Sequence, residues 1–369
     1  MLRLNGTLMS RDTQVAQVKD GNLEVINEAL LPLYLKRTGY LEGWLESRAI
    51  DRHRTNSRLL KKALRLSNYD DVSMVLKVSA ATITDTYWFK GDEESTLTYR
   101  DIVFKENLFD KLALYGDPDS FNLKYSPTPE LTNIGSYEKC WRLIDGHWWL
   151  YKQGNDLERF SEMFIYELGK ALGFSMAEYE LDGKYIRSRD FTDGASVNYE
   201  AANGLVGDND DYIFNFDAFE TLFPDTAKQY VTLIYLDTLC FNMDRHTENY
   251  GILRDVQTGA VLSLAPNFDN NIALLSRGYP KNEYRKNDKL VELFQELLLK
   301  RPKALRYFTK QIIPKLGRNL ILSCCDKIPV KVDRDFLCNF ILSADHQISQ
   351  FIQSSGMSNG FEDEPRQSL

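Results

Sequence analysis

The chain has 369 residues, of which 43% are hydrophobic and 12% aromatic, and its formal net charge is -8 at pH 7. This length fits two or three packed units, and the hydrophobic share excludes a disordered chain. The acidic balance argues against a protein that binds nucleic acid through a broad basic surface.

The cysteines are sparse and odd in number, and none is part of a CxxC pair. This pattern predicts buried thiols in a reducing compartment rather than zinc ligands or disulfides. No apolar run approaches the roughly 20 residues of a membrane-spanning helix, and the first residues lack the apolar core of a signal peptide. We therefore expect a cytoplasmic protein without membrane contact. The cysteines are Cys140, Cys240, Cys324, Cys325 and Cys338.

Residues 1–123 predict an N-terminal α+β unit. Apolar residues recur at helical spacing from 23 to about 66. Residues 72–99 are rich in β-branched and aromatic types, which favours strands. The basic residues of the helical part are expected on a solvated face. They include Arg48, Arg52, Arg54, Lys61, Lys62 and Arg65.

The remainder of the chain divides into a strand-rich and a helix-rich part. Residues 124–200 predict short strands and one helix, and residues 201–353 predict helices with a single β-ribbon. Residues 354–369 are polar and predict a disordered tail. Together these parts predict an α+β fold with two lobes, one built on strands and one mainly helical, next to the N-terminal unit.

A hairpin in the strand-rich part brings two lysines together. Asp145-Gly146 between aromatic and β-branched residues predicts a two-residue type I′ turn. Counting outward from this turn places Lys139 opposite Lys152. Like charges at such positions are destabilising, so a bound polyanion would relieve the repulsion. The alternative is that both amines extend into water. The same face carries a possible purine surface, made of Trp141, Leu143, Trp148 and Leu150.

Two neighbouring features belong with this hairpin. Gly135-Ser136 at its mouth offers backbone N–H groups to phosphates, although such pairs are common in loops. After the hairpin, Gly154-Asn155-Asp156 is placed to cap a helix over 157–172 that ends at Gly173. Glu162 lies at the edge of the apolar stripe of this helix, where it either orients Lys152 or is an ordinary solvated glutamate.

The helix-rich part contains the sequence Asp244-Arg245-His246-Thr247-Glu248-Asn249. A buried helix over 227–243 precedes it, and a hairpin over 250–264 follows it. Because a hairpin returns the chain to its starting end, Asn249 and Asp269 should lie near each other. Their amide and carboxylate oxygens suit Mg²⁺. Asp244 is then placed to accept the proton of an attacking hydroxyl, as in phosphoryl transfer. Taken singly, Asp244 and Asn249 are typical loop caps, and His246 is typical of a structural histidine.

Across residues 130–350, these motifs resemble the HipA-like serine/threonine kinases. The motifs are Gly135-Ser136-Tyr137-Glu138-Lys139, Leu150-Tyr151-Lys152, Glu162 with Ala171-Leu172-Gly173, Asn242 to Asn249, and Leu264-Ala265-Pro266-Asn267-Phe268-Asp269. The first motif differs from the Gly-x-Gln-Pro-Lys sequence that is more usual in the family. The resemblance implies a two-lobed kinase fold, a catalytic Asp244, and a Mg²⁺ held by Asn249 and Asp269. It implies that ATP phosphates are bound near Gly135, Ser136, Lys139 and Lys152, with Glu162 beside Lys152. It also implies that adenine is held near Tyr185, Arg187 and Arg189.

The sequence therefore predicts an ATP- and Mg²⁺-dependent kinase that phosphorylates Ser or Thr of a protein, or itself at Ser136. Asp-Arg-His-x-x-Asn also occurs in phosphatidylinositol kinases, so His246 is a candidate for proton transfer or for stabilising transition-state charge. The alternatives are a lipid or small-molecule kinase and an inactive nucleotide-binding interaction module. The expected partners are a protein substrate and an antitoxin-like or regulatory protein, with no nucleic acid as direct ligand.

Overall fold

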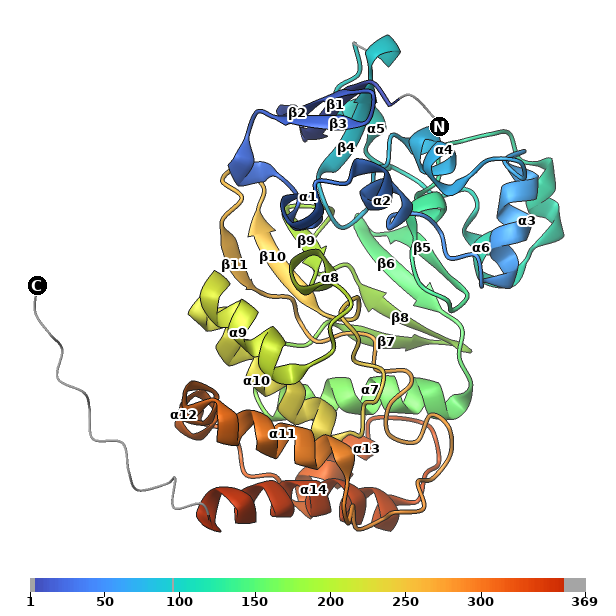
Figure 1. Cartoon of the computed structure of the whole chain (residues 1–369). Coiled ribbons are helices and arrows are strands. Elements are labelled where there is room, and N and C mark those ends of the chain that lie inside the picture. Colours follow the sequence, from blue (N-terminus) through green and yellow to red (C-terminus); the bar gives the residue numbers. More distant parts are fainter. Residues whose placement is uncertain (1–3, 95, 355–369) are drawn as a thin grey trace, which may run out of the picture.

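We describe the chain from a computed structural model that covers residues 4–94 and 96–354. Figure 1 shows the N-terminal unit at one end, the helix-rich part at the other, and strands between them. The tail predicted for 354–369 lies outside the described residues, except for Ser354, where α14 ends.

The N-terminal unit is built on a four-stranded antiparallel sheet in the order β3-β2-β1-β4. Its strands are β1 (Gly6–Ser10), β2 (Thr13–Lys19), β3 (Asn22–Val25) and β4 (Tyr87–Gly91). Its helices are α1 (Leu33–Thr38), α2 (Leu41–Glu46), α3 (Thr55–Ala63), α4 (Asp71–Val75), α5 (Tyr99–Ile102) and α6 (Asp110–Tyr115). Short 3-10 turns join them at Glu28–Leu30, Leu76–Val78, Asp92–Glu94, Pro118–Asn122 and Pro129–Thr132.

Two sequence expectations for this unit need correction. Residues 23–66 are not one helical region, because they start inside β3 and then form three separate helices. The β2–β3 hairpin turns at Asp20 and Gly21, whose φ angles of 50° and 80° suit an Asp-Gly turn. Among the described residues of 72–99, β4 is the one strand. The apolar residues at the start of this range instead pack as the helix α4 and the 3-10 turn that follows it.

The strand-rich lobe has a second four-stranded antiparallel sheet in the order β5-β6-β8-β7. Its strands are β5 (Lys139–Ile144), β6 (His147–Lys152), β7 (Tyr179–Asp182) and β8 (Tyr185–Arg189). The predicted hairpin is confirmed: Ile144 pairs with His147 and Lys139 with Lys152. The helix α7 (Asp156–Ala171) follows, and Asn155 caps it through the backbone N–H groups of its first turn. Gly173 stands just beyond its end with a φ of +80°.

The helix-rich lobe contains the predicted β-ribbon and most of the remaining helices. The strands β9 (Val197–Ala201), β10 (Gly251–Asp255) and β11 (Val261–Leu264) form a sheet in the order β11-β10-β9. The helices are α8 (Asn203–Val206), α9 (Tyr212–Leu222), α10 (Pro224–Leu239), α11 (Lys289–Lys300), α12 (Pro302–Lys310), α13 (Arg318–Cys325) and α14 (Arg334–Ser354). The mainly helical second lobe is confirmed.

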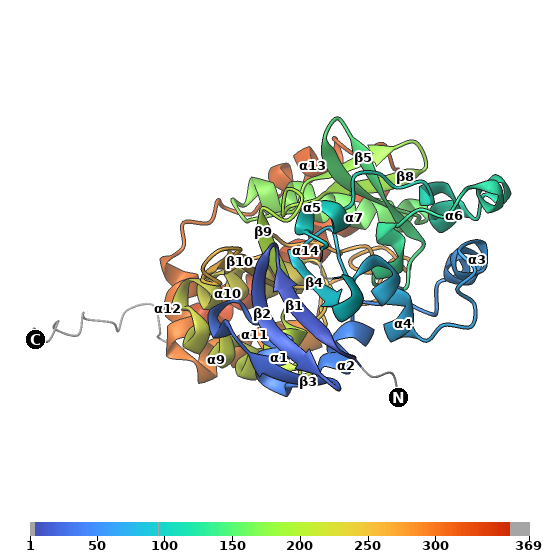
Figure 2. The ribbon, with the colours of Figure 1, turned by 90° about the horizontal axis from the view of Figure 1, so that it is seen from above.

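Two hydrophobic cores position the site between them. One joins α7, α10, α11 and α14, and it also receives Ile252 of β10. The other fills the N-terminal unit and includes Trp141 and Trp148 from β5 and β6. Figure 2 shows α3 and α6 together at one end of the molecule, beside β5. The N-terminal unit therefore packs directly on the hairpin that carries the two lysines.

Burial corrects one further expectation. Arg48 and Arg54, predicted on a solvated face, are only 9% and 1% exposed. Each guanidinium instead donates to backbone carbonyls and pairs with a buried carboxylate. All five cysteines are buried free thiols, as expected. None of the helices in the described residues has both the length and the apolar character that crossing a membrane requires.

Candidate active site

A cavity of about 290 Å³ lies where the two lobes and the N-terminal unit meet. Its walls come from the face of β5, β6 and β8, the loop 134–137, and the loops that follow α10 and β11. The sequence-predicted residues that line it are Gly135, Ser136, Lys139, Lys152, Arg189, Asp244, His246, Asn249 and Asp269. Segments more than 100 residues apart thus supply one site.

Lys152 of β6 is buried at the floor of the cavity, with 4% of its surface exposed. Its Nζ donates to Asp269 Oδ1 at 2.7 Å and lies 3.9 Å from Glu162 Oε1. Burial lowers the pKa of Lys152, but the two carboxylates outweigh that effect and raise it. Lys152 is therefore a fixed positive charge between the sheet and the loop after β11.

Lys139 lies directly across the ladder from Lys152 and is 8% exposed. Among the described residues, no hydrogen bond or ion pair reaches its amine. Burial lowers the pKa of Lys139 to about 7, with a further contribution from Lys152 and against the attraction of Asp269. The amine lies beside Gly135, where an added Cβ would stand 2.3 Å from Nζ. Neither lysine extends into bulk water, so the alternative of two solvated amines is wrong.

Glu162 projects from the middle of α7 and is fully buried. Its Oε1 accepts a hydrogen bond of 3.0 Å from the backbone N–H of Asn270. Burial raises the pKa of Glu162, although Lys152 counteracts this. The solvated alternative for Glu162 is therefore wrong, and the residue links α7 both to Lys152 and to the loop that carries Asp269.

Asp244 is half-buried in the loop that follows α10. The backbone carbonyl of Asp244 accepts hydrogen bonds from the His246 N–H and from Asn249 Nδ2, both at 2.9 Å. These bonds fold the loop so that the side chains of all three residues line one cavity. Burial raises the pKa of Asp244, and Asp269 adds to this. Its carboxylate receives no hydrogen bond from the residues that the structure describes, which leaves both oxygens available.

Asn249 and Asp269 supply the oxygen atoms predicted to hold a metal ion. Because Asn249 donates through Nδ2, its amide oxygen faces the cavity without a hydrogen bond from any described residue. Asp269 has a φ of +60°. Burial would raise its pKa, but Lys152 and Lys139 lower it to about 2, so its carboxylate stays ionised. This donor set fits Mg²⁺, which usually takes one or two protein oxygens and completes its shell with water and phosphate.

Arg245 is a structural residue of the site that the sequence reasoning missed. Its buried guanidinium pairs with Asp237 of α10 at 2.8 Å. It also donates to the carbonyls of Asn249 at 2.6 Å and Phe268 at 2.8 Å. One side chain thereby holds the loop that follows α10 against the loop that carries Asp269. The available signal was an aspartate, Asp237, within the buried stripe of a helix.

Two residues of the predicted adenine region do not reach the cavity. In β8, Arg187 pairs with Tyr151, and its guanidinium stacks on Trp149 on the far face of the sheet. Tyr185 shares this face because side chains alternate along a strand. Ser188, between Arg187 and Arg189, faces the cavity instead. The structure therefore separates Tyr185 and Arg187 from the other predicted ATP contacts. The same alternation turns the Arg189 side chain to the far face, where its guanidinium lies 3.0 Å from His147 Nδ1, although the residue itself borders the cavity at the end of β8.

Comparison with known proteins places this geometry in a known fold. No protein-family model and no curated protein sequence matches the chain. A similar solved structure is HipA of Shewanella oneidensis MR-1, in a complex with HipB and operator DNA. It is 13% identical, with a TM-score of 0.55, and the match covers 95% of this chain and 97% of that chain. The chain has a HipA-like kinase fold.

The HipA-like fold extends beyond the stretch that the motifs cover. Because the match takes in 95% of the chain, the N-terminal unit belongs to the shared architecture. A second similar structure is the proinflammatory kinase CtkA of Helicobacter pylori, which is 18% identical with a TM-score of 0.48. That match covers 59% of this chain and 95% of CtkA.

Proposed function

We propose that the protein is an ATP- and Mg²⁺-dependent kinase that transfers the γ-phosphoryl group to a Ser or Thr hydroxyl of a protein. One observation carries the proposal: Asp244, Asn249 and Asp269 line a single cavity opposite the buried Lys139 and Lys152. Phosphoryl transfer needs this combination of a proton acceptor, metal ligands and cations near the phosphates.

The roles follow from the contacts of each side chain. Lys152 and Lys139 provide positive charge at the sheet, and Glu162 keeps Lys152 in place. The carboxylate of Asp244, which receives no hydrogen bond from the described residues, accepts the proton of the acceptor hydroxyl. His246 Nδ1 accepts a hydrogen bond from the Glu248 N–H at 3.3 Å, so Nε2 carries the proton of the neutral ring. His246 can therefore donate to a developing charge.

Asn249 and Asp269 are the residues that would hold Mg²⁺. When bound, the ion neutralises phosphate charge and orients the oxygens for in-line transfer. Lys152 already contacts Asp269 Oδ1 at 2.7 Å. The second carboxylate oxygen of Asp269 and the amide oxygen of Asn249 are therefore the atoms offered to the ion.

The test is incubation with γ-labelled ATP and Mg²⁺, using wild type, Asp244→Asn, and Asp210→Asn as a control at an exposed aspartate outside the cavity. We expect label on a protein with wild type and the control, and a loss of at least roughly 100-fold with Asp244→Asn. Nucleotide binding without transfer in wild type would indicate an interaction module. Transfer only to lipids or to small compounds with a hydroxyl group would indicate a lipid or small-molecule kinase.

Ser136 is our candidate for autophosphorylation. It is exposed in the loop 134–137 and lines the cavity. A phosphate on Ser136 would repel the phosphates of ATP and move the loop outward. Mass spectrometry of ATP-treated protein should find phosphoserine at 136 and lower nucleotide affinity in that fraction. Unmodified Ser136 in protein that does label other substrates would rule out this role.

We also propose an antitoxin-like or regulatory protein partner. The support is the S. oneidensis HipA structure, which contains HipB. Crosslinking in the native host, followed by mass spectrometry, should recover one partner in stoichiometric amount. Recovery of the chain alone, under conditions that capture known complexes, would contradict the proposal.

A further inference from the structure

The loop 134–137, between the N-terminal unit and β5, is held mainly at its ends. Among the described residues, none of these four takes part in a backbone–backbone hydrogen bond. Within the loop, the hydroxyl of Tyr137 donates to Glu158 of α7 at 3.0 Å. The shape of the loop therefore depends on what fixes the residues on either side of it.

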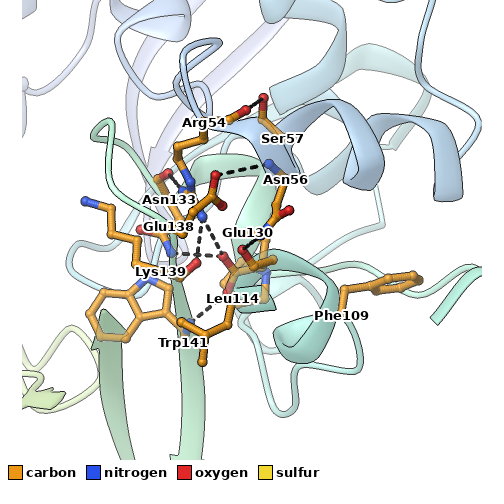
Figure 3. Close-up of polar contacts among 12 residues, drawn as sticks. Arg54, Asn56, Ser57, Phe109, Leu114, Glu130, Asn133, Glu138, Lys139 and Trp141 are labelled. Carbon is orange, nitrogen blue, oxygen red and sulfur yellow. Dashed lines mark hydrogen bonds and ion pairs between the residues drawn. The ribbon is translucent and has the colours of Figure 1, made fainter. Parts of the chain in front are cut away.

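Arg54 fixes both sides at once. Its Nη1 donates to the carbonyl of Asn133 at 2.8 Å, just before the loop. Its Nη2 donates to the carbonyl of Lys139 at 2.6 Å, just after it. Arg54 directly precedes α3, so a residue of the N-terminal unit spans the base of the loop. Figure 3 shows this guanidinium among Asn133, Glu130 and Lys139.

A buried carboxylate holds Arg54 in that position. Glu130 is fully buried, and its Oε2 lies 3.8 Å from Arg54 Nη2. Glu130 also accepts hydrogen bonds from the Trp141 N–H at 2.7 Å and from Asn133 Nδ2 at 2.9 Å. Because the same carboxylate contacts the residues that flank the loop, Arg54 and Glu130 form one support beneath it.

The start of α3 adds a second contact to the end of the loop. The backbone N–H of Asn56, in the first turn of α3, donates to Glu138 Oε1 at 3.1 Å. A carboxylate at this position is favoured by the unpaired N–H groups and the dipole of a helix start. Two neighbouring points of the N-terminal unit thus hold the loop.

We propose that Arg54 is a positioning residue for ATP binding, through which the N-terminal unit sets the shape of the loop 134–137. The inference rests on the proposed function, because it assumes that the loop receives phosphates. Gly135, Ser136 and Lys139 line the same cavity, and the Lys139 amine lies beside Gly135. Two backbone N–H groups and an amine are therefore the donors that this end of the cavity offers to phosphates. Release of one end would turn these donors away from each other and weaken nucleotide binding.

The test compares Arg54→Lys with Arg48→Lys. Lysine keeps the positive charge but cannot donate to two separated carbonyls from a rigid fork. Arg48 is a matched control: it is also buried in the N-terminal unit, donates to the carbonyls of Ala80 and Tyr87, and pairs with Asp85. It makes no contact with residues 133–139 in the hydrogen bonds described.

Two readouts separate positioning from general damage. For Arg54→Lys we expect at least about tenfold faster hydrogen exchange in the nucleotide-free protein at the hydrogen-bonded amides that flank the loop, those of Asn133 and Trp141. We also expect about tenfold weaker binding of a fluorescent ATP analogue, which corresponds to about 1.4 kcal/mol. The KM for ATP should rise while kcat at saturating ATP changes less than about threefold. Values for Arg54→Lys equal to those of Arg48→Lys would overturn the inference.

The hydrogen-exchange readout separates this inference from the proposed function. If wild type binds no ATP analogue but Arg54→Lys still loosens the loop, the proposed function fails while the support of the loop by Arg54 stands. If Arg54→Lys does not fold, Glu138→Ala serves instead, because it removes only the contact with Asn56. Exchange and ATP affinity that are unchanged in Glu138→Ala would then overturn the inference.

Discussion

Lys152 Nζ lies 2.7 Å from Asp269 Oδ1, so an ion pair crosses the cavity from the sheet to the loop that follows the ribbon. The same amine is 3.9 Å from Glu162. This lysine therefore neutralises the carboxylate that we propose as a metal ligand. Bound Mg²⁺ would interact with the Asp269 carboxylate, and the phosphates of the nucleotide would interact with the Lys152 amine. Metal binding and phosphate binding would therefore be linked.

Lys152→Met should remove the central charge of this arrangement. We expect phosphoryl transfer to fall by roughly 100-fold and the free energy of unfolding to fall by about 3 kcal/mol, since Asp269 and Glu162 lose their buried partner. Mg²⁺ should restore part of the lost stability. Urea unfolding with and without Mg²⁺ measures both effects. Lys184→Met, at an exposed lysine near the same sheet, should change neither quantity, and an equal loss in both variants would contradict the assigned role.

Lys139 should make stability depend on pH. Its pKa is about 7 in the folded protein, below the ordinary value of 10.5, so the unfolded chain binds more protons between these pH values. Stability from this group therefore rises with pH over that window, and the cost of the buried charge is complete below about pH 7. Lys139→Met should be more stable than wild type near pH 6, on the order of 2 kcal/mol. Chemical denaturation from pH 6 to 10 should show this difference shrinking; a constant difference would refute it.

The same lysine predicts proton uptake when phosphate binds. A polyanion beside Lys139 favours its charged form and raises its lowered pKa. At about pH 8, ATP binding should take up on the order of one half to one proton from the buffer. Calorimetry in two buffers of different ionisation enthalpy measures this number, and Lys139→Met should abolish most of it. Equal uptake in wild type and variant would assign the proton to another group.

Arg245→Lys should separate the two loops that Arg245 joins. Lysine keeps one charge near Asp237 but cannot also reach the carbonyls of Asn249 and Phe268. We expect kcat to fall at least about tenfold because Asp244 loses its position, with a loss of stability of about 3 kcal/mol. Steady-state kinetics at saturating ATP and a denaturation curve measure the two effects.

Arg285→Lys is the control for Arg245→Lys. Arg285 is also fully buried, pairs with Asp288 and donates to the carbonyls of Thr238 and Leu239, but it does not line the cavity. It should lose similar stability and keep most of its kcat. A similar fall in kcat would show that Arg245 acts only through general stability.

Much of the site could be predicted because its signals are local. The turn at Asp145-Gly146 determined the register that opposes Lys139 and Lys152. The ribbon after Asn249 required its two ends to meet, and both ends line the cavity. In these cases a short-range rule, the two-residue turn or the hairpin return, decides which side chains become neighbours.

What could not be predicted depends on contacts between distant segments. Arg54 reads as an exposed helix residue until Glu130, 76 positions later, is placed beside it. The separation of Arg187 from the cavity depends on which face of β8 turns inward, and that is set by its pairing with β6. Leu23 lies in a strand because Asp20-Gly21 turns the chain back onto β2, a signal that the apolar spacing of the helices obscured.

The hydrogen bonds of Arg245 also bear on which parts of the protein can move. One buried guanidinium binds the carbonyls of both Asn249 and Phe268 and pairs with Asp237 of α10. It therefore joins the loop after α10 and the loop after β11 to that helix. Under the proposed kinase function, we therefore expect the movement that admits or releases a nucleotide to occur in the sheet β5-β6-β8-β7 and the loop 134–137. Product release should accordingly be sensitive to changes in the N-terminal unit, and insensitive to changes at the surface of the helical lobe.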